Sequence, residues 1–257
     1  MGIYAAFTLW SLGYLSQALQ RSHEMLMLAQ ELAHPFSLAY ALSTASSVHQ
    51  LRREAQAGQQ CAEAAMALSR EQGFPHWLAI GTIRHGWALA AQGEGAEGVK
   101  QIQQGIAAWR ATGANLNRAW FLAGLAEACA KAGKAEEGLT ALAEALTAVR
   151  ATANRACEAE LYRLKGELLL GEAAGTTRQL PVHIEAETCF HQALAVARRQ
   201  QAKSLELRAA TSLGRLWQQQ GKHAEAHELL APVYGWFTEG FDTADLQEAK
   251  ALLDALA

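Results

Sequence analysis

Turn positions recur along this chain at a fixed spacing. Stepping by 40 from Gly13 gives Arg53, Gly93 and Gly133, and Gly221 rejoins the series after an insertion of about eight residues. Pro35 and Pro75 are separated by the same interval, and each opens an apolar segment. A fixed period of this kind is the signature of a repeat architecture, in which one supersecondary unit is stacked many times.

Two columns of small residues keep the same register. The first is Ala6, Ser46, Gly86, Ala126, Gly166 and Gly214, and the second is Ala18, Gly58, Gly98, Gly138, Ala186 and Ala226. Two antiparallel helices approach within about 8–10 Å only where the contact carries small side chains. We therefore expect one column on the first helix of each hairpin and the other on the second.

Apolar residues at helical spacing place thirteen helices. The first helices are expected at about 3–11, 36–52, 76–91, 116–131, 155–170 and 203–220, the second helices at about 14–33, 54–73, 95–112, 135–152, 183–201 and 223–237, and a capping helix at about 243–256. Asp242-Thr243 is a plausible cap for the last helix. The insertion predicts a loop at about 171–182. If each hairpin contacts only its neighbours, residues 1–257 form a single continuous solenoid.

Composition supports an all-α fold and excludes several functions. Alanine is the commonest residue, good helix formers dominate, and only four prolines occur. The net charge of −3 gives no large basic surface for nucleic acid. No apolar run approaches the roughly 20 residues that span a bilayer. Four isolated cysteines, with no CxxC pair, indicate reduced, buried thiols in a cytoplasmic protein.

The repeat units resemble the tetratricopeptide repeat (TPR), whose pattern is W-x2-L-G-x2-Y, then A-x3-F, then P. The fourth unit reads Leu122-x2-Leu125-Ala126-x2-Cys129, and the sixth reads Leu213-Gly214-x2-Trp217 followed by Ala226-x3-Leu230. The resemblance implies a right-handed superhelical, TPR-like solenoid of about six helix hairpins with a C-terminal capping helix. The unit here exceeds the common TPR unit of about 34 residues, so its helices are longer than the common type.

A narrower resemblance concerns 161–170, 185–194 and 229–246. These stretches are similar to the C-terminal repeat region of bacterial signalling ATPases that carry adenylate-cyclase-like or LuxR-type DNA-binding modules. The resemblance covers only the repeat array, because the chain has no GxxxxGK[ST] motif. It implies that this chain is a fragment of a longer multidomain protein and that the array regulates a catalytic neighbour.

Motifs that could carry chemistry have simpler explanations. Gly93–Gly98 matches GxGxxG, but a helix rather than a strand precedes it, and the repeat columns already explain the glycines. His183-Ile-Glu185 with Cys189 lacks the PCxxC half of a zinc-deaminase signature. His223 and His227 lie four residues apart on one helix, with no third ligand indicated. We therefore expect no enzyme, no metal and no cofactor.

The resemblance to TPR arrays implies a concave groove lined by the first helices. Carried over position by position, the partner-binding residues are Phe7, Trp10, Tyr40, Trp87 and Trp120 in an aromatic N-terminal half, and Glu127, Arg163, Glu167, Arg208 and Gln218 in a charged C-terminal half. Aromatic and arginine side chains are frequent interface anchors, but these aromatics could instead pack between hairpins. The Lys and Asn residues of one known carboxylate-clamping subclass are absent.

The sequence therefore favours a protein-interaction scaffold. The partner is expected to be a protein or peptide segment, helical or extended and apolar or amphipathic, or another domain of the same polypeptide. We expect neither a nucleic acid nor a membrane as partner. The alternative is a small-molecule-sensing module that controls a transcription, cyclase or ATPase domain, which would need a closed pocket with convergent polar groups.

Overall fold

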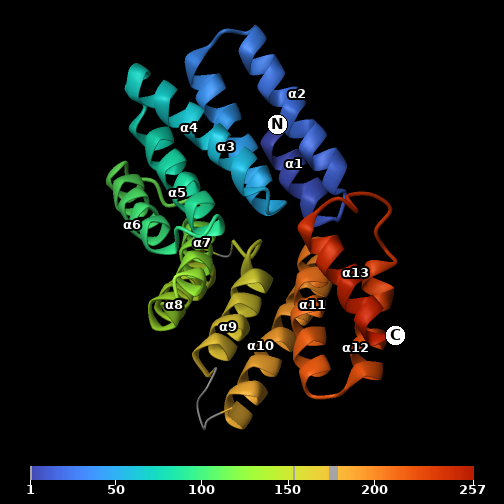
Figure 1. Ribbon diagram of the computed structural model, residues 1–257. Helices are drawn as coiled ribbons and strands as arrows, with labels where there is room; N and C mark the ends of the chain where they lie inside the picture. Colours follow the sequence, from blue (N-terminus) through green and yellow to red (C-terminus); the bar gives the residue numbers. More distant parts are fainter. Residues whose placement is uncertain (1, 153, 174–178) are drawn as a thin grey trace.

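The computed structural model describes residues 2–152, 154–173 and 179–257. Within those ranges the chain forms thirteen α-helices and no strand (Figure 1). The helices are α1 (Gly2–Ser11), α2 (Leu15–Glu31), α3 (Pro35–Leu51), α4 (Ala55–Gln72), α5 (Pro75–Ala91), α6 (Gly95–Ala111), α7 (Arg118–Lys131), α8 (Ala135–Thr152), α9 (Glu158–Ala173), α10 (Gln179–Gln200), α11 (Lys203–Gln219), α12 (His223–Tyr234) and α13 (Ala244–Leu256). The predicted all-α class and the thirteen helices are confirmed.

The expected insertion loop is shorter than the sequence indicated. Helix α9 continues to Ala173, α10 begins at Gln179, and the remainder of the expected loop, 174–178, lies outside the described residues. Pro181 is the third residue of α10. Proline is tolerated in the first helical turn, where its missing N–H would have no intrahelical partner. The prediction was wrong there because proline was treated as a helix breaker.

The repeat period corresponds to left-handed turn residues. In five of the six hairpins the chain turns at a residue with positive φ, namely Gly13, Arg53, Gly93, Gly133 and Gly221, and the turn of the fifth hairpin lies outside the described residues. A residue in this conformation commonly ends a helix because it redirects the chain and satisfies the last carbonyls. Arg53 is the one non-glycine in the series, with φ of 63°, a conformation that costs an L-residue about 1 kcal/mol or more.

Small residues lie where the two helices of a hairpin cross. A Cβ built on Gly98 would lie 2.5 Å from the carbonyl oxygen of Gly86, so the two backbones are in direct contact. In the second hairpin the Ser46 hydroxyl donates to the Gly58 carbonyl at 2.8 Å. In the second and third hairpins the two predicted columns therefore meet at the crossing point, and the packing of α5 on α6 leaves no room for a side chain.

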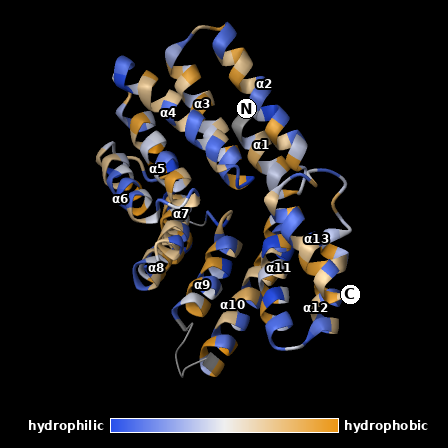
Figure 2. Ribbon diagram, in the orientation of Figure 1, coloured by the Kyte–Doolittle hydropathy of each residue, from blue (hydrophilic) through white to orange (hydrophobic). Residues whose placement is uncertain are grey.

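The hairpins stack so that consecutive first helices contact one another, in the order α1, α3, α5, α7, α9 and α11. Apolar and polar residues alternate around the helices in Figure 2, as expected of helices with one buried face. The buried residues form two large clusters, one centred on α5–α9 and the other on α9–α13 with Trp10, Leu15 and Ala18 from the first hairpin. No helix of the described ranges is both long and apolar enough to cross a membrane.

The last unit contacts the first two hairpins, which a chain of nearest-neighbour contacts would not provide. Helix α11 packs on α1, and the Ser204 hydroxyl donates to the Trp10 carbonyl at 2.5 Å. A Cβ at Gly13 would lie 2.7 Å from the Trp236 ring, and one at Gly240 would lie 2.7 Å from Leu15. The solenoid therefore completes one turn, which brings α11 and the loop between α12 and α13 against the first hairpin (Figure 1). We call this region the closing contact.

The N-terminus of α2 is capped from across the closing contact. Its N-cap residue, Tyr14, makes no side-chain cap. Instead the Glu239 carboxylate accepts from the backbone N–H groups of Ser16 at 2.9 Å and Gln17 at 3.1 Å. A carboxylate at a helix N-terminus satisfies free donors and favours the helix dipole. The C-terminal loop thus stabilises a helix whose first turn lies 223 positions away in the sequence.

The capping helix is present as α13, but its own cap differs from the expectation. Thr243 occupies the N-cap position without a side-chain cap, because its hydroxyl donates to the Gly240 carbonyl at 2.6 Å. Asp242 pairs with Arg52 instead. Leu246, Ala249 and Leu252 bury the inner face of α13 in the second cluster. The helix therefore covers the end of the array, while the residues before it contribute to the closing contact.

The Gly86 crossing is testable by a single methyl group. In Gly86→Ala the new Cβ would lie 2.8 Å from the Gly98 carbonyl oxygen, so the helices must separate. We expect a loss of about 1–3 kcal/mol in the free energy of unfolding, measured by urea denaturation. Gly171→Ala, with nothing within 4 Å of its Cβ, is the matched control and should be neutral or slightly stabilising. Equal losses would contradict the packing explanation.

Candidate functional site

Two of the predicted aromatic groove residues are buried in the core. Trp10 is 2% exposed and lies under the Arg208 guanidinium, which is 5.1 Å from the centre of its ring. Trp87 is 3% exposed, and its Nε1–H donates to the Glu127 carboxylate at 2.8 Å. Both rings are therefore held by contacts within the chain, and Glu127 is engaged by one of them.

The other aromatic residues of the predicted groove are half-buried. Tyr40 packs against Trp77 at 5.3 Å between ring centres, and burial together with the charge of Tyr4 raises the pKa of its phenol. Trp120 packs against both core clusters. Phe7 is half-buried on α1. These rings form part of the inner face while also contributing to packing between hairpins.

The charged half of the predicted groove is an ion-pair network. Arg163 pairs with Glu160 at 2.9 Å and with Glu167 at 3.3 Å. Arg208 pairs with Glu160 at 3.3 Å and with Asp245 at 2.8 Å. Burial alone would raise the pKa of Glu160, but the two arginines lower it to about 2. The network therefore joins α9, α11 and α13 across the end of the array, and Gln218 lies half-buried farther along α11.

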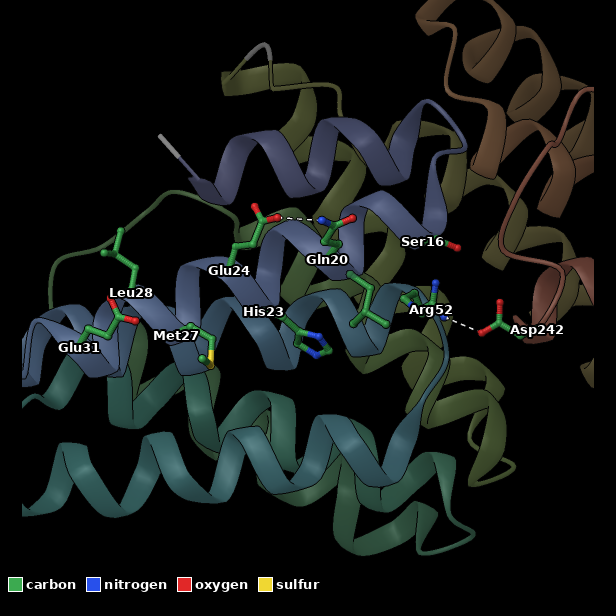
Figure 3. A pocket seen from close by; sticks show the side chains of 10 residues that line it. Ser16, Gln20, His23, Glu24, Met27, Leu28, Glu31, Arg52 and Asp242 are labelled. Carbon is green, nitrogen blue, oxygen red and sulfur yellow. Dashed lines mark hydrogen bonds and ion pairs between the residues drawn. The ribbon is translucent and has the colours of Figure 1, made fainter.

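A cavity of about 600 Å³, which sequence reasoning missed, lies along the outer face of α2. It is open to solvent and is lined by Ser16, Leu19, Gln20, His23, Glu24, Met27, Leu28 and Glu31 of α2, together with Arg52 and Asp242. Figure 3 shows Gln20, Glu24 and Leu28 along one edge of the helix and His23 and Met27 along the other. Met27 and Leu28 are 59% and 55% exposed, so α2 carries an uncovered apolar strip here.

Arg52 closes one end of this cavity and is held by three elements. Its guanidinium donates to the Leu15 carbonyl at 2.9 Å, to Glu54 at 2.8 Å and to Asp242 at 3.1 Å. Its side chain is only 2% exposed. Because Asp242 belongs to the loop before α13, this end of the cavity exists only when the closing contact is formed (Figure 3). A local sequence pattern gives no signal for a pair 190 residues apart.

Below the cavity, His49 connects α3 to α4. Its Nδ1 lies 2.6 Å from the Glu54 carboxylate, and its ring is 6.2 Å from that of His23. Burial by itself would lower the pKa of His49, but hydrogen bonds with the Cys61 thiol and with Glu54 raise it to about 9. The imidazolium is therefore the favoured form of His49 near neutral pH.

The candidate chemical motifs have structural positions. Gly93 is a positive-φ turn residue, and Gly98 packs on Gly86, so the GxGxxG match belongs to the repeat. In the described residues no group of three or more His, Cys, Asp or Glu side chains is placed to hold a metal ion, and His223 and His227 stand without a third ligand. The four cysteines are free thiols, three buried and Cys61 half-buried.

The fold defines a class: an array of TPR-like helix hairpins. The structure is similar to the crystal structure of BtubC (BKLC) from P. vanneervenii, with a TM-score of 0.57, 16% identity, and coverage of 94% of this chain and 89% of that one. It is also similar to a Podosopora anserina putative kinesin light chain with nearly identical TPR-like repeats, with a TM-score of 0.52, 16% identity, and coverage of 86% and 97%. At these identities the likeness establishes the fold alone. No protein-family model and no curated protein matches the sequence.

Arg208 provides a test of the ion-pair network. Arg208→Met removes one of the two arginine partners of each of two buried carboxylates, since Glu160 keeps Arg163 and Asp245 keeps Arg53. Leaving a buried charge with no partner costs about 3–5 kcal/mol, so we expect a loss of about 2–3 kcal/mol here, which urea unfolding would measure. Arg215→Met is the control, because Arg215 pairs only with half-exposed Glu248 and should lose less than about 1 kcal/mol. Losses of the same size would show that the network does not stabilise the fold.

His49 makes stability depend on pH. The folded-state pKa of about 9 exceeds the ordinary value of 6.5, so the stabilisation is complete below pH 6.5 and is lost as pH rises through 9. We expect the free energy of unfolding to fall by roughly 2–3 kcal/mol over that interval. Urea melts from pH 6 to 9.5 would measure it, with His49→Gln as the control that lacks this slope. The same slope in both proteins would exclude His49 as its source.

Proposed function

We propose that this chain is a protein-interaction array and that its principal docking surface is the cavity beside α2. One observation carries the proposal. Of the ten exposed large hydrophobic residues in the described part of the chain, five lie within 4–36: Tyr4, Met27, Leu28, Leu32 and Phe36. Met27 and Leu28 of these line the cavity together, and uncovered apolar residues that adjoin one another indicate an interaction site, whereas scattered residues do not.

The charge around the apolar strip indicates the chemistry of the partner. Glu24, Glu31 and Asp242 line the cavity, and its one arginine, Arg52, is already paired with Glu54 and Asp242. Glu24 is itself paired with Arg21 at 2.8 Å, so the rim has three carboxylates against two guanidinium groups and is slightly acidic around apolar Met27 and Leu28. An amphipathic helix with apolar residues on one face and Lys or Arg beside them complements this surface, as in the helix-in-groove mode of recognition.

The inner face remains a second proposed contact region. Phe7, Tyr40, Trp120, Glu167 and Gln218 are half-buried there. Trp10, Trp87, Glu127, Arg163 and Arg208 contact other residues of the chain, as described above. We propose that a segment on the inner face would contact the first group, and that the second group maintains the shape of the array.

The resemblance of 161–170, 185–194 and 229–246 to bacterial signalling ATPases supports a more specific role. On that basis we propose that the array is the regulatory region of a cytoplasmic bacterial signalling protein. Its docking surface would bind a partner or a catalytic domain of the same polypeptide. Neither nucleic acid nor membrane is part of this proposal, because the chain carries a net charge of −3.

The second candidate function is small-molecule sensing, favoured by the size of the cavity. About 600 Å³ lies within the range of roughly 300–1,000 Å³ typical of ligand pockets. The cavity also contains His23 and Ser16 as polar groups. Its openness to solvent favours a protein segment over an enclosed small molecule.

Synthetic helical peptides would test the docking surface. One set would carry an apolar face flanked by lysines, and a matched set would carry the same apolar face flanked by glutamates. We expect the basic set to bind, by calorimetry, and Met27→Gln with Leu28→Gln to weaken binding about tenfold or more, since both residues are central to the apolar strip.

Leu116→Gln is the matched control, because Leu116 is 62% exposed but lies far along the array. It should leave binding unchanged. Equal binding of the acidic and basic sets, or no effect of the double substitution, would exclude the α2 surface. Binding of small organic molecules but of neither peptide set by the wild type, lost in the double variant, would favour the sensing candidate.

A further inference from the structure

Arg84, on the inner face of α5, has no acidic partner. Its Nη1 donates to the amide oxygen of Gln50, and its Cζ lies 5.4 Å from the centre of the Phe121 ring. Its Nε is shielded from solvent and has no hydrogen-bond acceptor. No carboxylate of the described residues forms an ion pair with it. Burial lowers the pKa of this guanidinium to about 10.

The other arginines that are not exposed all pair with carboxylates. Arg52 has Glu54 and Asp242, Arg118 has Glu144, Arg163 has Glu160 and Glu167, and Arg208 has Glu160 and Asp245. A guanidinium taken from water without an anion costs free energy that an amide oxygen and an aromatic ring offset only in part. Among the described residues, Arg84 is thus the one arginine that is not exposed and has no carboxylate partner.

The donors left over by Arg84 and Gln50 converge. Gln50 accepts at Nη1, so the edge formed by Nε and Nη2 is free, and this is an edge that binds a carboxylate through two parallel hydrogen bonds. Gln50 uses its oxygen for Arg84 and presents its Nε2 amino group, a further donor, towards α7. The positive charge of the Arg84 guanidinium, together with the neutral Gln50 amino group as a donor, is suited to a ligand with a single negative charge.

Gly124 leaves room beside these donors. A Cβ at this position would meet Gln50 Nε2 at 3.4 Å and no other of the surrounding atoms within 4 Å. Glycine inside a helix costs about 1 kcal/mol relative to alanine, and here no close backbone contact requires it. Gly124 lies one turn beyond Phe121, the residue under Arg84, so the space beside Gln50 Nε2 lies on the same helix as the ring that Arg84 covers.

We propose that Arg84 and Gln50, with the space at Gly124, form a binding site for a carboxylate group. The site lies on α3, α5 and α7, whereas the apolar strip of the proposed docking surface lies on α2, so the two can be tested separately. It does not use the positions of the carboxylate-clamping TPR subclass, which here carry Ser43, Ser47, Ile83, Trp87, Ala123 and Glu127. The carboxylate can belong to a peptide or to a small organic acid.

The test uses sodium acetate as the probe, with sodium chloride at the same ionic strength as reference. In the wild type, acetate should shift the Arg84 Nε–H resonance in ¹⁵N–¹H spectra and raise the melting temperature. Arg84→Gln should lose both responses, and Gly124→Leu should weaken acetate binding about tenfold or more because its side chain fills the space. Arg118→Gln, at a paired arginine, should respond like the wild type.

Short peptides with a free or an amidated C-terminus distinguish the two sources of the carboxylate. Tighter binding of the free peptide than of acetate assigns the site to a protein segment, and equal binding assigns it to a small acid.

Arg84→Met should raise the melting temperature in chloride, since it removes an unpaired charge. The proposal is overturned if chloride reproduces the acetate response, or if Arg84→Gln responds to acetate like the wild type. It is also overturned if Arg84→Met is more stable than the wild type but no variant responds differently to acetate and to chloride. If Gly124→Leu does not fold, Arg84→Gln decides the test.

Discussion

The close crossing of the two helices in each hairpin is the constraint on which the rest of the structure depends. At Gly86 and Gly98 the backbones touch, and small residues occupy the equivalent positions in the other hairpins. At the crossing of Gly86 and Gly98 the distance is set by backbone, whereas Gly166 packs against the Phe190 ring and Gly138 against Leu168, so small residues let both backbones and large side chains approach closely. Identical units stacked in one direction produce a superhelix, and here one turn brings the last unit against the first two.

The C-terminal end of α3 is where the two ends of the array meet. Gln50 reaches Arg84 of α5, the Leu51 carbonyl accepts from Arg208 of α11, and Arg52 binds Asp242 before α13. Arg53 adopts a strained left-handed conformation and pairs with Asp245 and Glu248 of α13. The strain at Arg53 is offset by contacts that a glycine could not make. One helix end thus joins the closing contact, the cavity beside α2 and the inner face.

This arrangement separates the surfaces that sequence reasoning had combined. Residues expected to line a single groove divide into a buried set, such as Trp10 and Trp87, and a half-buried set, such as Tyr40 and Trp120. Arg163 and Arg208 appeared to be interface anchors, but they neutralise Glu160. The sequence gives no signal for the exposure of Met27 and Leu28, because apolar spacing is the same for a helix face covered by another helix and for one left open.

The sequence by itself determined the repeat unit. Helix spans, the turn series from Gly13 to Gly221 and the two small columns follow from local rules: the helical period, the left-handed turn and the close backbone crossing. Only the tertiary structure decided how the ends meet, since the pairs of Glu239 with the N-terminus of α2 and of Asp242 with Arg52 join groups 223 and 190 positions apart. Such contacts depend on rotations summed over six units, and no local pattern records that sum. The cavity beside α2 results from this long-range geometry. So do the ion pairs of the buried arginines, in which Arg84 takes no part.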